Sequence, residues 1–161
     1  MGNYIHFYSG VPEENRTKRR VSLLNHKKWK HNITNWQCID ERIIIVNIII
    51  LKTRFTIIGA YGPNEGESVA NKDHFYETLQ RVVTDFRNNT ELVLVGGFNA
   101  RTERSNNSHI IGSFAEEESN DNGARLIELC EQCNLIITIL FNIKRFINLH
   151  GNKTPKFEIS Y

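Results

Sequence analysis

The feature that most constrains the fold of this chain is a run of β-branched residues near position 45. Ile43–Ile50 consists of seven Ile or Val residues and one Asn. β-branched side chains lose rotamer freedom in a helix and pack well on a pleated sheet. Because both alternate sets of positions are apolar, the run predicts a strand that is buried on both faces. The apolar stretch ends after nine residues at Leu51, whereas a membrane-spanning helix needs about 20.

The residues after this run predict a hairpin and then a helix. Lys52–Arg54 is a short polar break, Phe55–Tyr61 is a second strand, and Gly62-Pro63-Asn64 ends it because proline cannot continue a ladder. Apolar residues then recur at steps of three and four, which predicts one face of a helix. Ser68 is the expected N-cap and Asn88-Asn89 the expected end. The apolar positions are Phe75, Tyr76, Leu79, Val82, Val83 and Phe86.

The rest of the chain alternates strands with one more helix. Leu92–Val95 is a short apolar strand that Gly96-Gly97 halts, and a long polar loop runs from Arg101 to Asn120. Asp121 or Asn122 is the expected cap of a helix over 124–133. Tyr4–Tyr8 predicts a strand followed by a turn, and Leu135–Leu140 is again strand-like. Weaker strand patterns occupy Val21–Leu24, Arg145–Leu149 and Phe157–Ile159. This order of elements predicts a layered α/β (α+β) fold.

Composition limits the class of protein. The chain has 161 residues, of which 40% are hydrophobic, so we expect a single domain over 1–161 with a real core. A net charge of +2 argues against a global polycation. Met1–Gly10 lacks the basic and apolar regions of a signal peptide, and an odd cysteine count fits a reducing compartment. Cys130 and Cys133 form a C-x-x-C, for which we favour buried packing over a redox or half-zinc site.

Charge is clustered near the N-terminus. Arg16–His31 contains seven Lys or Arg and no acid, with Trp29 in its midst and Trp36 just beyond it. Such residues contact phosphates and stack on bases in nucleic-acid-binding proteins, and Lys27, Lys28 and Lys30 are the candidates here. The alternative is a solvated loop, which is the commoner role of a charge run.

The stretch Leu92–Arg101 is the most informative one for chemistry. An apolar strand ends in glycines and then presents Asn99, and ligands gather at the carboxyl ends of strands in α/β sheets. Spacing alone favours a simpler interpretation, a glycine turn that carries a surface asparagine. No Ser-nucleophile elbow or phosphate-binding P-loop is present.

Several segments together resemble one family. Gly96-Gly97-Phe98-Asn99-Ala100-Arg101 resembles the G-D-F-N-A-R motif of the endonuclease/exonuclease/phosphatase superfamily, and the chain is most similar there to the craniofacial development protein 2-like and non-LTR retrotransposon endonucleases. The resemblance covers nearly the whole chain in order and spacing. Further matching segments are Asn35–Ile44, Thr56–Asn64, Asp73–Leu79 and Asn120–Cys130.

The resemblance implies a four-layer α/β sandwich that hydrolyses DNA phosphodiesters with Mg²⁺. In the family an Asp activates water, an Asn and a Tyr position the phosphate, a Glu near the N-terminus holds the metal, and a C-terminal Asp-His pair completes the site. A hard cation prefers oxygen ligands and neutralises charge on the phosphate. Tyr61 and Asn99 fall at the Tyr and Asn positions, and we expect Arg101 to be an outer phosphate contact.

The departures from the family pattern predict an impaired enzyme. The general-base Asp corresponds to Gly97, and the Asp of a late I-D-Y element corresponds to Ser160. The resemblance also implies a partial domain without the outer segments that carry the metal Glu and the Asp-His pair. A lost general base costs about 10²–10⁴ in rate, so we expect no useful nuclease activity and no retained Mg²⁺. The alternatives are a non-catalytic remnant that binds DNA or protein, and a pseudogene product.

Overall fold

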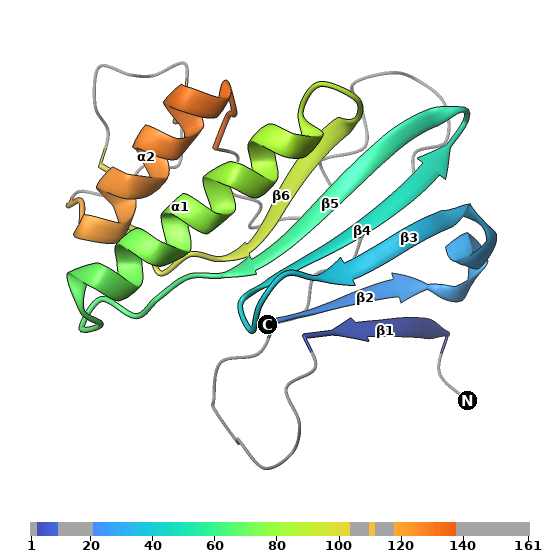
Figure 1. Ribbon diagram of the computed structural model, residues 1–161, viewed down its shortest axis with the longest axis horizontal. Coiled ribbons are helices and arrows are strands. Elements are labelled where there is room, and N and C mark those ends of the chain that lie inside the picture. Colours follow the sequence, from blue (N-terminus) through green and yellow to red (C-terminus); the bar gives the residue numbers. More distant parts are fainter. Residues whose placement is uncertain (1–2, 10–20, 104–109, 112–117, 138–161) are drawn as a thin grey trace, which may run out of the picture.

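The computed structural model describes residues 3–9, 21–103, 110–111 and 118–137 (Figure 1). Its larger sheet has the strand order β3-β4-β5-β6. Strands β3, β4 and β5 pair antiparallel, and β6 pairs parallel to β5. The strands span Ile33–Cys38 (β3), Ile43–Ile50 (β4), Thr53–Tyr61 (β5) and Glu91–Gly97 (β6).

Each face of this sheet is covered by a different layer. On one face, Ile43, Ile45 and Ile58 pack against helices α1 (Val69–Phe86) and α2 (Asp121–Cys133). On the other, Ile44 and Val46 pack against the small antiparallel sheet of β1 (Tyr4–Tyr8) and β2 (Ser22–His26). The predicted mixed α+β content is confirmed, and the layers are compatible with a partial α/β sandwich (Figure 1).

Strand β4 is the centre of the core, as its β-branched run predicts. Ile43, Ile44 and Ile45 are all 0% exposed, although they point alternately to opposite faces. The break after it is shorter than predicted, because β5 begins at Thr53 rather than Phe55. The turn is Leu51-Lys52, and both residues have positive φ, 49° and 71°. A two-residue turn of this kind matches the twist of the two strands it joins.

Local capping chemistry sets both helix starts. Ser68 Oγ accepts a hydrogen bond from the Asn71 amide at 3.3 Å, which confirms the predicted cap of α1. The prediction for α2 is wrong: the cap is Asn120 and the helix begins at Asp121. Asn120 Oδ1 accepts from the Gly123 amide at 2.8 Å, in the manner typical of an N-cap.

The C-x-x-C of α2 behaves as core. Cys130 and Cys133 are free thiols that are 3% and 4% exposed. Burial raises the pKa of the Cys130 thiol to about 12, so its reactive thiolate is scarce at neutral pH. The preference for buried packing is therefore confirmed. Neither described α-helix is long and apolar enough to span a bilayer.

Two elements were not predicted, and some predictions lie beyond the described residues. Strand β3 and the 3-10 helix η1 (Lys27–Asn32) are mostly exposed and polar, so they lack an apolar period. The pattern at 135–140 is described as far as Ile137, which forms a parallel bridge with Ile111. The strand patterns at 145–149 and 157–159 lie outside the described residues.

Candidate active site

Three residues singled out by the family motif lie together at one edge of the larger sheet. Tyr61 and Gly97 are the last residues of the parallel strands β5 and β6 and are partners in register. Asn99 follows two residues later. We call this region the carboxyl edge, defined by Tyr61, Gly97, Asn99 and Arg101. The N-termini of both helices flank it (Figure 1), which is the usual place for a ligand in an α/β sheet.

The two glycines at the end of β6 have opposite structural roles. Gly96 has φ +144°, and a Cβ there would lie 1.8 Å from the Ala60 carbonyl oxygen. Only glycine fits that position. A Cβ at Gly97 would meet nothing closer than the Tyr61 ring, at 3.8 Å and 3.9 Å, which is ordinary van der Waals contact. The backbone therefore requires glycine at 96 but leaves room for a side chain at 97.

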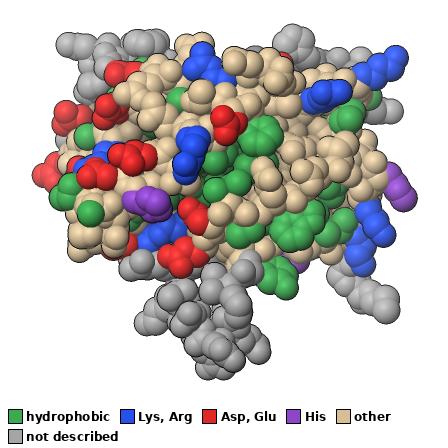
Figure 2. Space-filling model, viewed as in Figure 1, with side chains coloured by type: hydrophobic (Ala, Val, Ile, Leu, Met, Phe, Trp, Pro, Cys, Tyr) green, Lys and Arg blue, Asp and Glu red, His purple; other side chains and the backbone are tan. Residues whose placement is uncertain are grey.

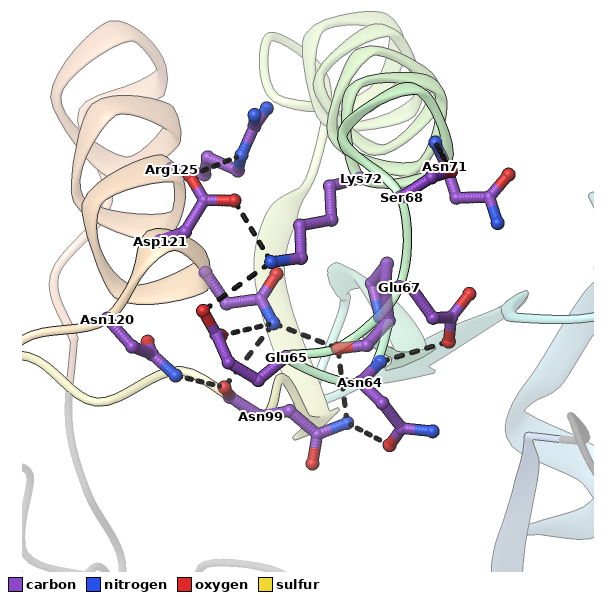
Figure 3. A network of polar contacts seen from close by, with 12 residues as sticks. Asn64, Glu65, Glu67, Ser68, Asn71, Lys72, Asn99, Asn120, Asp121 and Arg125 are labelled. Atoms are coloured by element: carbon purple, nitrogen blue, oxygen red, sulfur yellow. Dashed lines mark hydrogen bonds and ion pairs between the residues drawn. The ribbon is translucent and has the colours of Figure 1, made fainter.

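Asn99 holds the loop between β5 and α1. Its Nδ2 donates to the Gly62 oxygen at 3.0 Å, the Pro63 oxygen at 3.3 Å and Asn64 Oδ1 at 3.4 Å (Figure 3). Its backbone is left-handed, with φ 49°, a conformation that asparagine tolerates better than most residues. The Nδ2 hydrogens of Asn99 are already donated to these acceptors. To contact a phosphate, the Asn99 side chain would have to break those hydrogen bonds.

Two asparagines from the start of α2 fix the backbone of Asn99. The Asn99 oxygen accepts from Asn120 Nδ2 at 3.0 Å and from Asn122 Nδ2 at 3.5 Å. Asn122 is 0% exposed, and its Nδ2 also donates to the Pro63 oxygen at 2.9 Å. Its Oδ1 has no partner among the described residues. The sequence pattern at 120–123 resembles the family, but it did not predict this bracing role.

Arg101 lies beside the same helix start. Its amide donates to Asn120 Oδ1 at 2.9 Å, and its carbonyl oxygen accepts from the Asn120 amide at 3.2 Å. A Cβ at Gly123 would lie 1.8 Å from that oxygen, so the helix packs against the loop with no room for a side chain. The Arg101 residue is exposed, which is compatible with an outer contact to an anion.

An ion-pair network supports the carboxyl edge from the helix side (Figure 3). The Lys72 side chain is 5% exposed, and its ammonium lies 3.1 Å from Asp121 and 3.5 Å from Glu65. Arg125 pairs with Asp121 at 3.0 Å and with Asp73. The hydrogen bond from Lys72 is the main reason that the pKa of Asp121 falls below its usual value. A buried lysine is rare unless it is paired in this way.

A second pair, also missed by sequence reasoning, holds the backbone of Tyr61. Arg42 Nη2 donates to both oxygens of Glu67, at 2.8 Å and 2.9 Å, and Arg42 Nη1 donates to the Tyr61 oxygen at 3.3 Å. The Tyr61 amide in turn donates to the Arg42 oxygen at 2.9 Å. These hydrogen bonds are charge-assisted and therefore stronger than neutral ones, so Arg42 helps to fix the end of β5.

The basic candidates are far from this edge. Lys27, Lys28 and Lys30 lie on η1, which abuts the opposite end of β4, because Asn32 Nδ2 donates to the Ile49 oxygen at 2.8 Å. The nine residues of β5 separate the two ends by roughly 26 Å. The structure thus groups Tyr61, Gly97, Asn99 and Arg101 but not the lysines. Ser160 and the basic residues at 16–20 lie outside the described residues.

The acidic residues of the described part do not converge on one point. No group of three or more His, Cys, Asp or Glu side chains that could hold a metal ion occurs within residues 3–9, 21–103, 110–111 and 118–137. The carboxylates closest to the carboxyl edge in the hydrogen-bond network, Glu65 and Asp121, already pair with Lys72.

Comparison with known proteins links the chain to one named protein. No protein-family model matches it. It is 27% identical over 136 residues to craniofacial development protein 2 of Bos taurus. The aligned part covers 84% of this chain and 22% of the relative. Craniofacial development protein 2 of Tragulus javanicus is 24% identical over 135 residues, and the aligned part covers 84% of this chain and 23% of that relative. The chain therefore spans less than a quarter of these relatives, and over most of its own length it is distantly similar to craniofacial development protein 2.

Proposed function

We propose that this chain derives from a Mg²⁺-dependent endonuclease domain of the endonuclease/exonuclease/phosphatase type, and that it does not cleave phosphodiesters itself. The proposal is supported by the motif resemblance, by the distant similarity to craniofacial development protein 2, and by the geometry of the carboxyl edge. There the positions of the family's Tyr, Asp and Asn are neighbours, at Tyr61, Gly97 and Asn99.

The observation that carries the proposal is the open space at Gly97. A side chain would fit against the Tyr61 ring, so the backbone does not explain why glycine stands where the family has its general base. Glycine has no group that accepts a proton from water. Loss of such a base lowers the rate by about 10²–10⁴. Catalytic groups act as a unit, so the loss of this one member is enough to disable the site.

The described residues do not fit a Mg²⁺ site. A hard cation needs several oxygen ligands, and the nearby carboxylates of Glu65 and Asp121 are committed to Lys72. The Asn99 amide is held by the β5–α1 loop. The residues of this chain at the carboxyl edge therefore position a loop rather than a phosphate.

A supercoiled-plasmid nicking assay with Mg²⁺ or Mn²⁺ tests the proposed inactivity. The wild-type chain should nick no more DNA than a Tyr61→Phe/Asn99→Ala variant purified in the same way. Nicking by the wild type that the double variant lacks would overturn the proposed inactivity.

Restoring a carboxylate at Gly97 tests whether this position fits the family's base. Gly97→Asp should be about as stable to urea as Gly97→Ala, because both side chains fit against the Tyr61 ring. It should still fail to nick DNA, since one carboxylate does not complete the site. A Gly97→Asp variant that is much less stable than Gly97→Ala would argue against a former carboxylate at this position.

A further inference from the structure

A second surface, at the far end of the sheet, collects positive charge from two separate segments. We call it the basic end, defined by Lys27, Lys28 and Lys30 of η1 and by Lys52 and Arg54 of the β4–β5 hairpin. All five residues are exposed, and neither 27–38 nor 48–56 contains an acid. Within the part of the chain that the structure describes, none of the five makes an ion pair.

The fold holds these charges in place rather than leaving them on a loose loop. The Lys27 amide donates to the Asn3 oxygen at 2.7 Å, and the Lys28 amide donates to His26 Nδ1 at 3.1 Å. Asn32 ties the end of η1 to Ile49, next to the hairpin turn. A backbone that is already ordered loses less conformational entropy on binding than a disordered segment.

The remaining charge of the molecule is arranged to favour one orientation of a polyanion. In Figure 2, acidic side chains gather on the left, over the helices, with some Lys and Arg side chains among them, whereas the right side, over η1 and the hairpin, shows Lys and Arg side chains. One acid, Glu91 of β6, lies opposite Phe55 and borders the basic end. A polyanion is thus attracted to the basic end and repelled by the helix layer.

Trp29 lies among the cations of the basic end. The Lys28 ammonium lies 5.3 Å from the centroid of its ring. Because Trp29 lies among the five cations, its fluorescence also reports what binds there.

We infer that the basic end is a nucleic-acid-binding surface that contacts the phosphate backbone and is separate from the carboxyl edge. The choice of a nucleic acid rests on the proposed function, whereas the location of the surface does not. The hairpin end of β5 lies roughly 26 Å from Tyr61, the length of the strand. A strand bound at the basic end therefore makes its main contacts away from Gly97, and binding is independent of any chemistry there.

The experiment is a salt series of oligonucleotide binding by the full chain, followed by fluorescence anisotropy. If four of the five cations contact phosphates, the slope of log K against log [salt] should be about −3 to −4. Lys52→Gln/Arg54→Gln should weaken binding roughly five- to tenfold and make the slope shallower by about 2. A matched double variant on α1, Arg81→Gln/Arg87→Gln, should leave both nearly unchanged. Thermal melts confirm that each variant is folded.

The possible outcomes separate this inference from the proposed function. Equal losses in the two double variants, or a slope near zero, would overturn the basic end as a binding surface. A loss of affinity in Tyr61→Phe/Asn99→Ala equal to that in Lys52→Gln/Arg54→Gln would place binding at the carboxyl edge and would also overturn it. Failure of the Gly97→Asp test bears only on the proposed nuclease origin and leaves these expectations unchanged.

Discussion

The two ends of the larger sheet differ in how their polar residues are used. Around the carboxyl edge, Asn99, Asn120 and Asn122 brace two loops and Lys72 is buried between two carboxylates, and the Arg101 side chain is the exposed one. At the basic end the five cations make no ion pair among the described residues and face solvent. The comparison indicates that the first region maintains the fold, whereas the second is available to a partner.

The largest expected effect contrasts two neighbouring glycines at the carboxyl edge. Gly96→Ala should cost roughly 4 kcal/mol, because its Cβ would collide with the Ala60 oxygen in a left-handed backbone. Gly97→Ala should be neutral or stabilise by about 0.5 kcal/mol, since it restricts the unfolded chain at a compatible position. Urea denaturation measures both. If Gly97→Ala is as damaging as Gly96→Ala, the space at 97 is not open.

The next largest expected loss of stability comes from replacing the buried Asn122. Asn122→Ala should destabilise the chain by about 2–3 kcal/mol, because the oxygens of Pro63 and Asn99 lose a donor in a buried setting. Asn88→Ala, at an exposed asparagine after α1, is the matched control and should change stability by less than about 0.5 kcal/mol. Similar urea midpoints for the two variants would show that the hydrogen bonds of Asn122 do not stabilise the fold.

Acid should weaken the carboxyl edge through Asp121. Its pKa is lowered in the folded state, mainly by Lys72, so its contribution to stability is present above the usual pKa and is lost as pH falls through the folded value. Wild type should therefore lose more stability than Asp121→Asn between pH 6 and pH 3. The difference should stay below about 1 kcal/mol, because the Asp121 side chain is 42% exposed and solvent screens it. Parallel loss in both proteins would contradict this role.

The smallest expected effect lies at the basic end. Leu51 has φ 49° in the hairpin turn and is 85% exposed. Leu51→Asn should stabilise the chain by about 0.5–1 kcal/mol, since asparagine suits a left-handed turn position and no packing is lost. Differential scanning calorimetry would show a higher Tm, and a lower one would contradict this account of the turn.

The parts of this molecule that could be predicted are those set by local sequence. The burial of Ile43–Ile50 follows from β-branching, and α1 follows from its period and the Ser68 cap. Strand β3 was not predicted because it is an exposed edge strand with no apolar alternation. The predicted cap of α2, Asp121 or Asn122, was wrong. The observed cap, Asn120, also contacts Arg101, a partner 19 residues away that gives no local signal.

The same limit applies to the candidate site. Motifs single out Tyr61 and Asn99 as candidates, but the contacts of Arg42 and Asn122 depend on partners that folding alone brings near. The basic segment with Lys27, Lys28 and Lys30 is a separate candidate in the sequence, which does not say where these lysines lie relative to the motif residues. The hairpin geometry puts them at opposite ends of the sheet, which no spacing along the chain reveals.

The separation of the two regions is tested most directly by following backbone amide NMR signals during titration with one oligonucleotide. The account predicts that shifts concentrate in Lys27–Asn32 and at 51–54, while the amides of Tyr61, Gly97 and Asn99 stay unperturbed. Shifts that concentrate at Tyr61, Gly97 and Asn99 instead would show that the carboxyl edge still binds nucleic acid, and would contradict the account.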